Sequence, residues 1–168
     1  INNDDADATD PSFAVDDIVV SGIEDDGSPV ALCQDLSLAL GGDGTVSITA
    51  LDIDDGSTDD IGISDLSIDI DTFSCSDIGD NTVTLTVTDT DGNTDTCTST
   101  VTITDDLDPI AVCANISITL DEEGDATITA DQVDGGSTDN CGITSLSVNP
   151  SSFTDANIGP NAVVLTVN

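Results

Sequence analysis

The 168-residue sequence contains no lysine, arginine or histidine, although it has 35 acidic residues and a formal net charge of −35. No salt bridge between side chains can therefore form within the chain. The repulsion among so many carboxylates must be reduced by dissolved salt or by bound cations. Nucleic acids and anionic membrane surfaces are excluded as partners, because both are recognised through Lys or Arg.

Tryptophan, tyrosine and methionine are absent as well, and there are only three phenylalanines. Without His, Lys, Arg or Tyr, the Ser, Thr and Cys side chains have no basic partner that could activate them as nucleophiles. A pair of carboxylates could in principle hydrolyse a glycoside, but a chain without Trp or Tyr offers no surface on which a sugar stacks. We therefore expect a protein that is not an enzyme.

High acidity with few aromatic residues can indicate disorder, but here 37% of the residues are hydrophobic and they alternate regularly with polar ones. The five cysteines form no Cys-x-x-Cys pair and have no His beside them, which argues against zinc. They suit disulfides in an oxidising compartment. No apolar run approaches the roughly 20 residues of a membrane-spanning helix. The sequence thus predicts an extracellular or cell-surface protein that does not insert into a membrane.

The strongest feature of the sequence is an internal repeat of 80 residues that needs no gap. Cys33 recurs as Cys113, Phe73 recurs as Phe153, and the sequence Gly-Ser-Thr-Asp at 56–59 recurs at 136–139. We assign residues 28–107 to repeat 1 and residues 108–168 to repeat 2, which lacks a counterpart of the last strand of repeat 1. Residues 1–27 form an N-terminal segment with the pattern of one strand.

The pattern within each repeat is that of short strands. Residues 82–88 alternate Thr with aliphatic residues at period two, and Val46, Ile48 and Ala50 alternate in the same way. Glycine- and aspartate-rich turn sequences separate the strands. Six or seven short strands in about 80 residues, without helical periodicity, predict an all-β fold of tandem immunoglobulin-like β-sandwiches.

A disulfide between Cys33 and Cys97 is predicted within repeat 1. These residues lie on its first and last strands, and Cys97 is in phase with Val101 and Ile103, so that it faces the core. Closing the intervening loop contributes on the order of 4 kcal/mol in the chain-entropy model, which matters for a core this small. Cys113 has no counterpart of this partner, because the equivalent position lies beyond Asn168.

Several short motifs resemble the hyalin-repeat family of immunoglobulin-like modules. They are Pro-Val-Ala-Leu-Cys at 29–33, Asp-Asn-Cys-Gly at 139–142, Asp-Thr-Asp-Gly-Asn at 89–93 followed by Cys97, and Asp-Asp-Leu-Asp-Pro at 105–109. The resemblance covers residues 28–168 and is strongest to bacterial surface proteins. It implies tandem arrays with adhesive or spacer roles outside the cell and no catalysis.

The chain departs from that family at a second disulfide, which the resemblance leads us to expect in each repeat. Repeat 1 has Cys75 but Ile61 at the partner position, and repeat 2 has Cys141 but Asp155. Cys75 and Cys141 are therefore either free or paired with each other across the repeat junction. The second alternative requires their Cα atoms to lie within about 7 Å.

Calcium is the predicted cofactor, because it binds six to eight oxygen atoms, often from Asp and Asn. Asp89, Asp91 and Asn93 alternate as in a calcium loop, but they could equally form an ordinary hairpin turn. Two further groups of carboxylates are expected at the ends of the repeats, with a solvated acidic linker as the alternative. The first group is Asp105, Asp106, Asp108, Asp131, Asp134 and Asp139, at the junction, and the second is Asp25, Asp26, Asp52, Asp54, Asp55 and Asp59, at the start of repeat 1.

These observations favour a structural protein of an extracellular stalk or fibre. An adhesin or other ligand-binding module, and accessory repeats of a larger secreted enzyme, are the alternatives. Self-association into a head-to-tail polymer is also predicted, because residues 13–23 align with the last strand of repeat 1 at the 80-residue offset: Ile23 matches Ile103. They could complete repeat 2 of a neighbouring copy. Alternatively, the chain is a fragment and the last strand of repeat 2 lies downstream.

Overall fold

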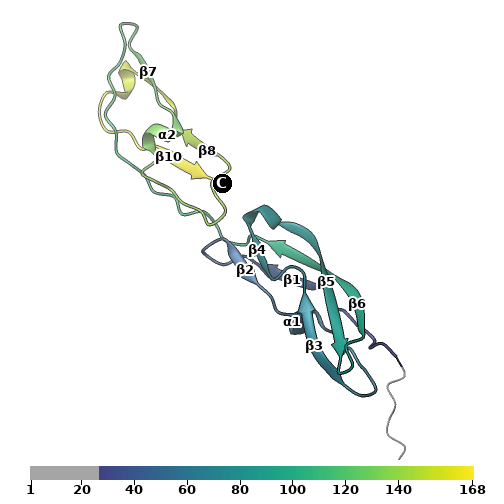
Figure 1. Cartoon of the computed structure of the whole chain (residues 1–168). Coiled ribbons are helices and arrows are strands. Elements are labelled where there is room, and N and C mark those ends of the chain that lie inside the picture. The colour runs from purple at the N-terminus through teal and green to yellow at the C-terminus, as the bar shows by residue number, and fades with distance from the viewer. Residues whose placement is uncertain (1–26) are drawn as a thin grey trace, which may run out of the picture.

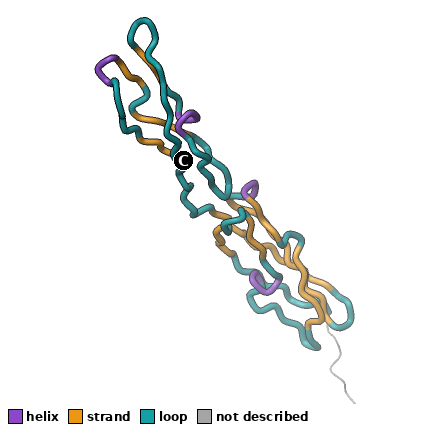
Figure 2. The backbone as a smooth tube through the Cα atoms, turned by 90° about the vertical axis from the view of Figure 1, so that its left-hand side faces the viewer, coloured by secondary structure: helices purple, strands orange, loops and turns teal. Residues whose placement is uncertain are grey.

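The computed structural model describes residues 27–168 as a predominantly β chain in which repeat 1 and repeat 2 follow each other along one long axis (Figure 1). Figure 2 shows the same elongated course from the side, with strands and loops running along the axis and only short helical turns between them. The all-β character predicted from the alternation of apolar residues is confirmed. The predicted strand at residues 13–23 lies outside the described residues.

The main sheet of repeat 1 has four strands in the order β1 (Leu36–Ala39), β6 (Thr94–Thr104), β5 (Gly79–Asp89) and β3 (Ile63–Ile68). Strand β6 is parallel to β1 and antiparallel to β5, so it joins the two halves of the sheet. The Thr–aliphatic alternation of β5 places every second side chain in the core and leaves the threonines toward the other face.

A smaller sheet of two strands, β2 (Thr45–Ser47) and β4 (Thr72–Ser74), contributes Phe73 to the same core. Phe73 pairs with Val46 and is 1% exposed. Side chains from both sheets thus meet in one hydrophobic core, which the single helical turn α1 (Ala50–Ile53) completes with the fully buried Ile53.

Helix α1 differs from the prediction that Val46, Ile48 and Ala50 share a strand. Strand β2 ends at Ser47, and Ala50 begins the helix. The reason is a capping box, in which the Asp52 carboxylate accepts hydrogen bonds from the Thr49 backbone N–H and from its hydroxyl. These local bonds outweigh the period-two pattern.

Repeat 2 repeats these elements with the 80-residue offset. It contains β7 (Asp125–Thr127), α2 (Ala130–Val133), β8 (Leu146–Asn149), β9 (Ser152–Thr154) and β10 (Val164–Val167), and the 3-10 turn at Asp155–Asn157 matches the one at Cys75–Asp77. The strand register is also repeated. Leu85 pairs with Ile68 in repeat 1, and Leu165 pairs with Val148 in repeat 2.

The core of repeat 2 is smaller than that of repeat 1. Among residues 27–168, nine buried hydrophobic residues form the first core and four form the second. Residues 116–119, the counterpart of β1, are not a strand, because no described segment takes the position that β6 has in repeat 1. The same alternating pattern of apolar and polar residues therefore gives a strand at 36–39 and an irregular segment at 116–119.

The difference between the cores predicts unequal effects of the same substitution. Val83 is fully buried in repeat 1, whereas its counterpart Val163 is only partly buried. Val83→Ala should lower the free energy of unfolding by about 2 kcal/mol, from lost burial and a residual cavity. Val163→Ala in dilute protein should lower it by less than half as much. Urea denaturation followed by circular dichroism measures both effects, since the chain has no Trp or Tyr for fluorescence, and equal losses would contradict the assignment of an open core to repeat 2.

Candidate functional site

Four of the five cysteines form disulfides. Cys33 and Cys97 are bonded, as the sequence predicts, with their Cα atoms 5.8 Å apart. Cys97 lies opposite Leu85 in the β5–β6 pairing, and Cys33 forms an isolated bridge with Asp54. The disulfide therefore attaches β6 to the start of repeat 1. In the part of the chain that the structure describes, Cys113 is a free and exposed cysteine.

The second disulfide joins the two repeats. Cys75 follows β4 in repeat 1 and Cys141 lies in repeat 2, and their Cα atoms are 5.3 Å apart. Of the two alternatives left open by the sequence, the structure has the pair across the junction. Cys141 also packs against the core of repeat 1, so that the first repeat extends its apolar surface into the second.

Asn140 fits closely between the repeats beside this disulfide. Its Nδ2 donates hydrogen bonds to the backbone oxygen of Gly41, at 3.2 Å, and to Oδ1 of Asp105, at 3.1 Å. Gly44 lies against it: a Cβ atom at Gly44 would be 2.8 Å from the Asn140 carbonyl oxygen and 2.9 Å from Cys75 Sγ. Gly44 also has a φ of 73°, which favours glycine. The junction therefore depends on close contact between the two backbones.

Elsewhere, carboxylates accept hydrogen bonds from backbone and hydroxyl groups in place of the missing cations. Oδ1 of Asp54 accepts bonds from the Ser57 hydroxyl and backbone N–H, and Asp134 makes the same pair of bonds with Ser137. In both cases the serine hydroxyl, followed by the nearby backbone N–H groups, lowers the pKa of the carboxyl below its ordinary value. The repeated Gly-Ser-Thr-Asp sequence thus supplies the serine donors that hold one preceding aspartate in each repeat.

The Asp89–Asn93 segment forms the hairpin turn between β5 and β6. Asp89 is 1% exposed, and its Oδ1 accepts bonds from the backbone N–H groups of Asp91 and Asn93, while its Oδ2 accepts one from Asn93 Nδ2. Burial alone would raise the pKa of Asp89, but these donors lower it below the ordinary value. The Asp89 carboxylate therefore orders its own turn, and a calcium ion at Asp89, Asp91 and Asn93 stays a prediction.

The other predicted calcium ligands are distributed over both repeats. Asp105 contacts Asn140, Asp139 accepts a bond from the Cys141 backbone N–H, and Asp59 accepts bonds from the N–H groups of residues 61 and 62. Asp52 belongs to the capping box of α1, and the side chains exposed to solvent are Asp55, Asp106, Asp108 and Asp131. Asp25 and Asp26 lie outside the described residues.

Within residues 27–168, no three acidic or cysteine side chains form a group that could hold a metal ion, and calcium stays a prediction.

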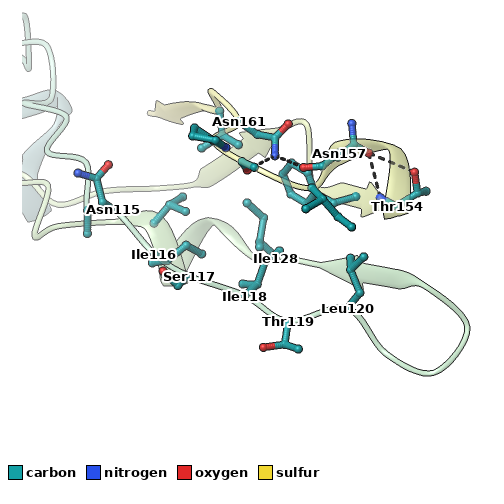
Figure 3. A pocket seen from close by; sticks show the side chains of 17 residues that line it. Asn115, Ile116, Ser117, Ile118, Thr119, Leu120, Ile128, Thr154, Asn157 and Asn161 are labelled. Atoms are coloured by element: carbon teal, nitrogen blue, oxygen red, sulfur yellow. Dashed lines mark hydrogen bonds between the residues drawn. The ribbon is translucent and has the colours of Figure 1, made fainter.

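Repeat 2 contains a groove. It has a volume of about 820 Å³ and lies between residues 114–120 on one side and 157–163 on the other. Buried side chains of the second core, Ile128, Val133 and Phe153, line its floor. Figure 3 shows the two walls facing each other across Ile128, with Thr119 directed away from the groove and Leu120 toward it.

Most of the backbone of both groove walls is not paired with the backbone of any other described segment. In repeat 1 the equivalent segments are bonded to β6 on either side of it. Among the described residues, no backbone hydrogen bond joins 115–120 or 159–163 to another segment. Ile116 and Ile118 on the first wall are 40% and 42% exposed.

A pair of equivalent asparagines shows the same difference. Asn81 Nδ2 donates to the backbone oxygens of Asp77 and Gly79 and to that of Val101 on β6. Asn161 Nδ2 makes the first two bonds, to Asn157 and Gly159, and its amide lines the groove. The recurrence of Asn at this position was the sequence signal for the groove wall, and the sequence prediction did not use it.

No protein-family model matches the chain, and no curated protein is significantly similar to it. The resemblance to hyalin repeats accordingly stays a prediction. None of the helices in residues 27–168 has the length and apolar character needed to cross a bilayer. The function is therefore inferred from the junction and the groove.

The lowered pKa of Asp54 gives a prediction about pH. A group whose pKa is lower in the folded than in the unfolded state stabilises the fold above its unfolded pKa, near 4, and this contribution disappears as pH falls through the folded value. Asp54→Ala should therefore lower the free energy of unfolding by about 1 kcal/mol at pH 7. The difference from the wild type should shrink steadily below pH 4. Asp55→Ala, at an exposed neighbour, is the matched control in urea titrations, and a difference that stays constant down to pH 2 would contradict the assignment.

The calcium prediction is tested by chelation at low salt. Cations that bind only to the folded chain raise its melting temperature, and the increase grows with the logarithm of their concentration relative to the Kd. Removing calcium with a chelator should lower the melting temperature measured by calorimetry, and adding calcium should restore it where an equal ionic strength of sodium does not. If sodium and calcium act alike at equal ionic strength, the effect is screening and there is no calcium site.

Proposed function

We propose that this chain is a non-catalytic extracellular structural protein, in which tandem immunoglobulin-like sandwiches form a rigid segment of a stalk or fibre. The observation that carries this proposal is the disulfide between Cys75 and Cys141, which joins the two repeats.

A structural spacer must hold a fixed length, and a single linker between two domains does not provide one. Relative motion is the ordinary expectation for domains joined by a linker and a small polar interface. Here the chain crosses from one repeat to the other at residues 105–109, and the disulfide provides a second covalent connection. Two separate connections greatly restrict bending and twisting at the junction.

The contacts around the disulfide also restrict motion between the two repeats. Asn140 bridges Gly41 and Asp105, and Cys141 packs against the core of the first repeat. The absence of a side chain at Gly44 allows the backbones to approach closely. These contacts favour one relative orientation of the repeats, and the resemblance to hyalin repeats implies the same spacer role.

The disulfides and the charge fit an extracellular location. Disulfides persist in oxidising environments and are rare in reducing ones. A net charge of −35 with no cation keeps neighbouring molecules apart laterally. Bound calcium, if the chelation test supports it, would reduce the repulsion along the fibre axis. The lack of acid–base side chains other than carboxylates supports a role without catalysis.

The proposal is tested by removing the junction disulfide. In small-angle X-ray scattering of dilute protein, the wild type should give the narrow distance distribution of a rigid rod. The double variant Cys75→Ser/Cys141→Ser should give a broader distribution with a shorter mean length, because the linker can then bend. Cys113→Ser, which leaves both disulfides intact, is the control. Scattering curves of the double variant and wild type that superimpose would remove the main support for a rigid structural role.

A further inference from the structure

The groove in repeat 2 has the features needed to bind a β-strand. Its two walls, 115–120 and 159–163, have backbone groups that are unpaired among the described residues, and its floor is apolar. In repeat 1 the equivalent walls bind the same strand, β6, from opposite sides. An extended peptide bound between two such edges gains main-chain hydrogen bonds on both sides and places alternate side chains in the core.

We propose that residues 13–23 of a second copy of this chain bind in this groove and complete repeat 2. This inference rests on the proposed structural role and adds the partner: copies of the chain join head to tail. Residues 13–23 have the length of β6, which has 11 residues. The groove is thus filled by the segment that precedes repeat 1 in the second copy.

The side chains of this segment fit the inward positions of the strand. The inward residues of β6 are Ser99, Val101 and Ile103, all at most 1% exposed. At the 80-residue offset, these positions are taken by Val19, Ser21 and Ile23. Both sets consist of one serine and two aliphatic residues, with Val19 at the position of Ser99, Ser21 at that of Val101 and Ile23 at that of Ile103.

The position of Cys97 marks the register. Cys97 is partly buried and is bonded to Cys33. In the proposed complex the corresponding pair is Asp17 of the incoming copy and Cys113 of the receiving one. Cys113 is exposed, so a carboxylate beside it can reach water. This pair cannot form a disulfide in the natural sequence.

The receiving repeat must belong to another molecule. The backbone oxygen of Gly27, the first described residue, accepts a hydrogen bond from Asn93 Nδ2 in the turn between β5 and β6. The described chain thus begins at the end of repeat 1 that points away from repeat 2 (Figure 1). The four Cα–Cα steps from Ile23, the last residue of the donated segment, to Gly27 span at most about 15 Å. Repeat 1 is longer than this, since an 11-residue strand such as β5 spans about 36 Å. The segment therefore cannot fold back along its own repeat 1 into its own groove.

The linker after the donated segment matches the linker between the repeats. Asp25-Asp26 corresponds to Asp105-Asp106, and Pro29 corresponds to Pro109. Repeat 1 of the incoming copy would thus contact repeat 2 of the receiving copy in the same arrangement that repeat 2 has against repeat 1 within one chain. At this junction Ile61 and Asp155 replace the two cysteines, so it is not covalent. The result is an open fibre, as head-to-tail contacts produce, in which disulfide-bonded and non-covalent junctions alternate.

A designed disulfide tests the partner and the register together. Asp17→Cys in the full chain should form an intermolecular disulfide with Cys113 under mild oxidation, because the equivalent Cα atoms of Cys33 and Cys97 are 5.8 Å apart. A ladder of multimers should appear on a non-reducing gel and disappear on reduction. Asp16→Cys, which faces the opposite side of the strand, should give no ladder, and neither should Asp17→Cys/Cys113→Ser.

A second measurement does not depend on polymer growth. A synthetic peptide of residues 13–23 carrying Asp17→Cys should become linked to Cys113 of the wild-type chain, and the same peptide with Asp16→Cys should not. Failure of both Asp17→Cys reagents, or equal linking at positions 16 and 17, would overturn the proposal and leave the groove to a strand from a different source. The scattering test of the junction disulfide is independent of this result, so loss of strand donation would leave the structural role intact.

Discussion

A repeat of this protein depends on one strand that binds two edges at once. In repeat 1 that strand is β6, which lies between β1 and β5 and supplies the buried Val101 and Ile103 to the core. It also carries Cys97, whose disulfide fixes it to the beginning of the repeat. With a strand in this position, repeat 1 has a four-stranded sheet and nine buried hydrophobic residues in its core. In repeat 2 the described residues leave the position open, and the neighbouring segment 116–119 is irregular although its sequence alternates as β1 does.

A second constraint is the complete lack of side-chain cations. Ordinary domains can stabilise a carboxylate with Lys or Arg, and this chain uses hydroxyl and backbone N–H groups instead. Asp54 and Asp134 are held by serines, Asp52 by Thr49, and Asp89 by its own turn. The local nature of these bonds explains why so many turns begin with aspartate. It also means that each carboxylate is stabilised within its own loop, while long-range repulsion is left to dissolved ions.

Much of the fold could be predicted from the sequence, because its signals are local or exactly repeated. The 80-residue period, the strand pattern of residues 82–88 and the Cys33–Cys97 disulfide required only spacing and alternation. Helix α1 was not predicted, because the apolar alternation through Ala50 favours a strand, whereas Thr49 and Asp52 have the spacing of a capping box.

The features of the candidate site were harder to predict, since they depend on how distant segments meet. The pairing of Cys75 with Cys141 was left open because spacing gives no Cα distance between repeats. The bridging role of Asn140 depends on the orientation of repeat 2 against Gly41 and Asp105. For the Asp89 turn, sequence alone could not separate a metal loop from a self-bonded turn, because both use the same residues.

Hydrogen–deuterium exchange tests the central claim most directly, namely that the groove of repeat 2 is a strand site filled by a second copy. In dilute protein, the amides of residues 115–120 and 13–23 should exchange fast. As the protein concentration is raised and fibres form, both segments should become protected at the same concentration. Residues 35–40, which already pair with β6 in repeat 1, should stay protected throughout. Protection of 115–120 in fibres while 13–23 continues to exchange fast would contradict the account.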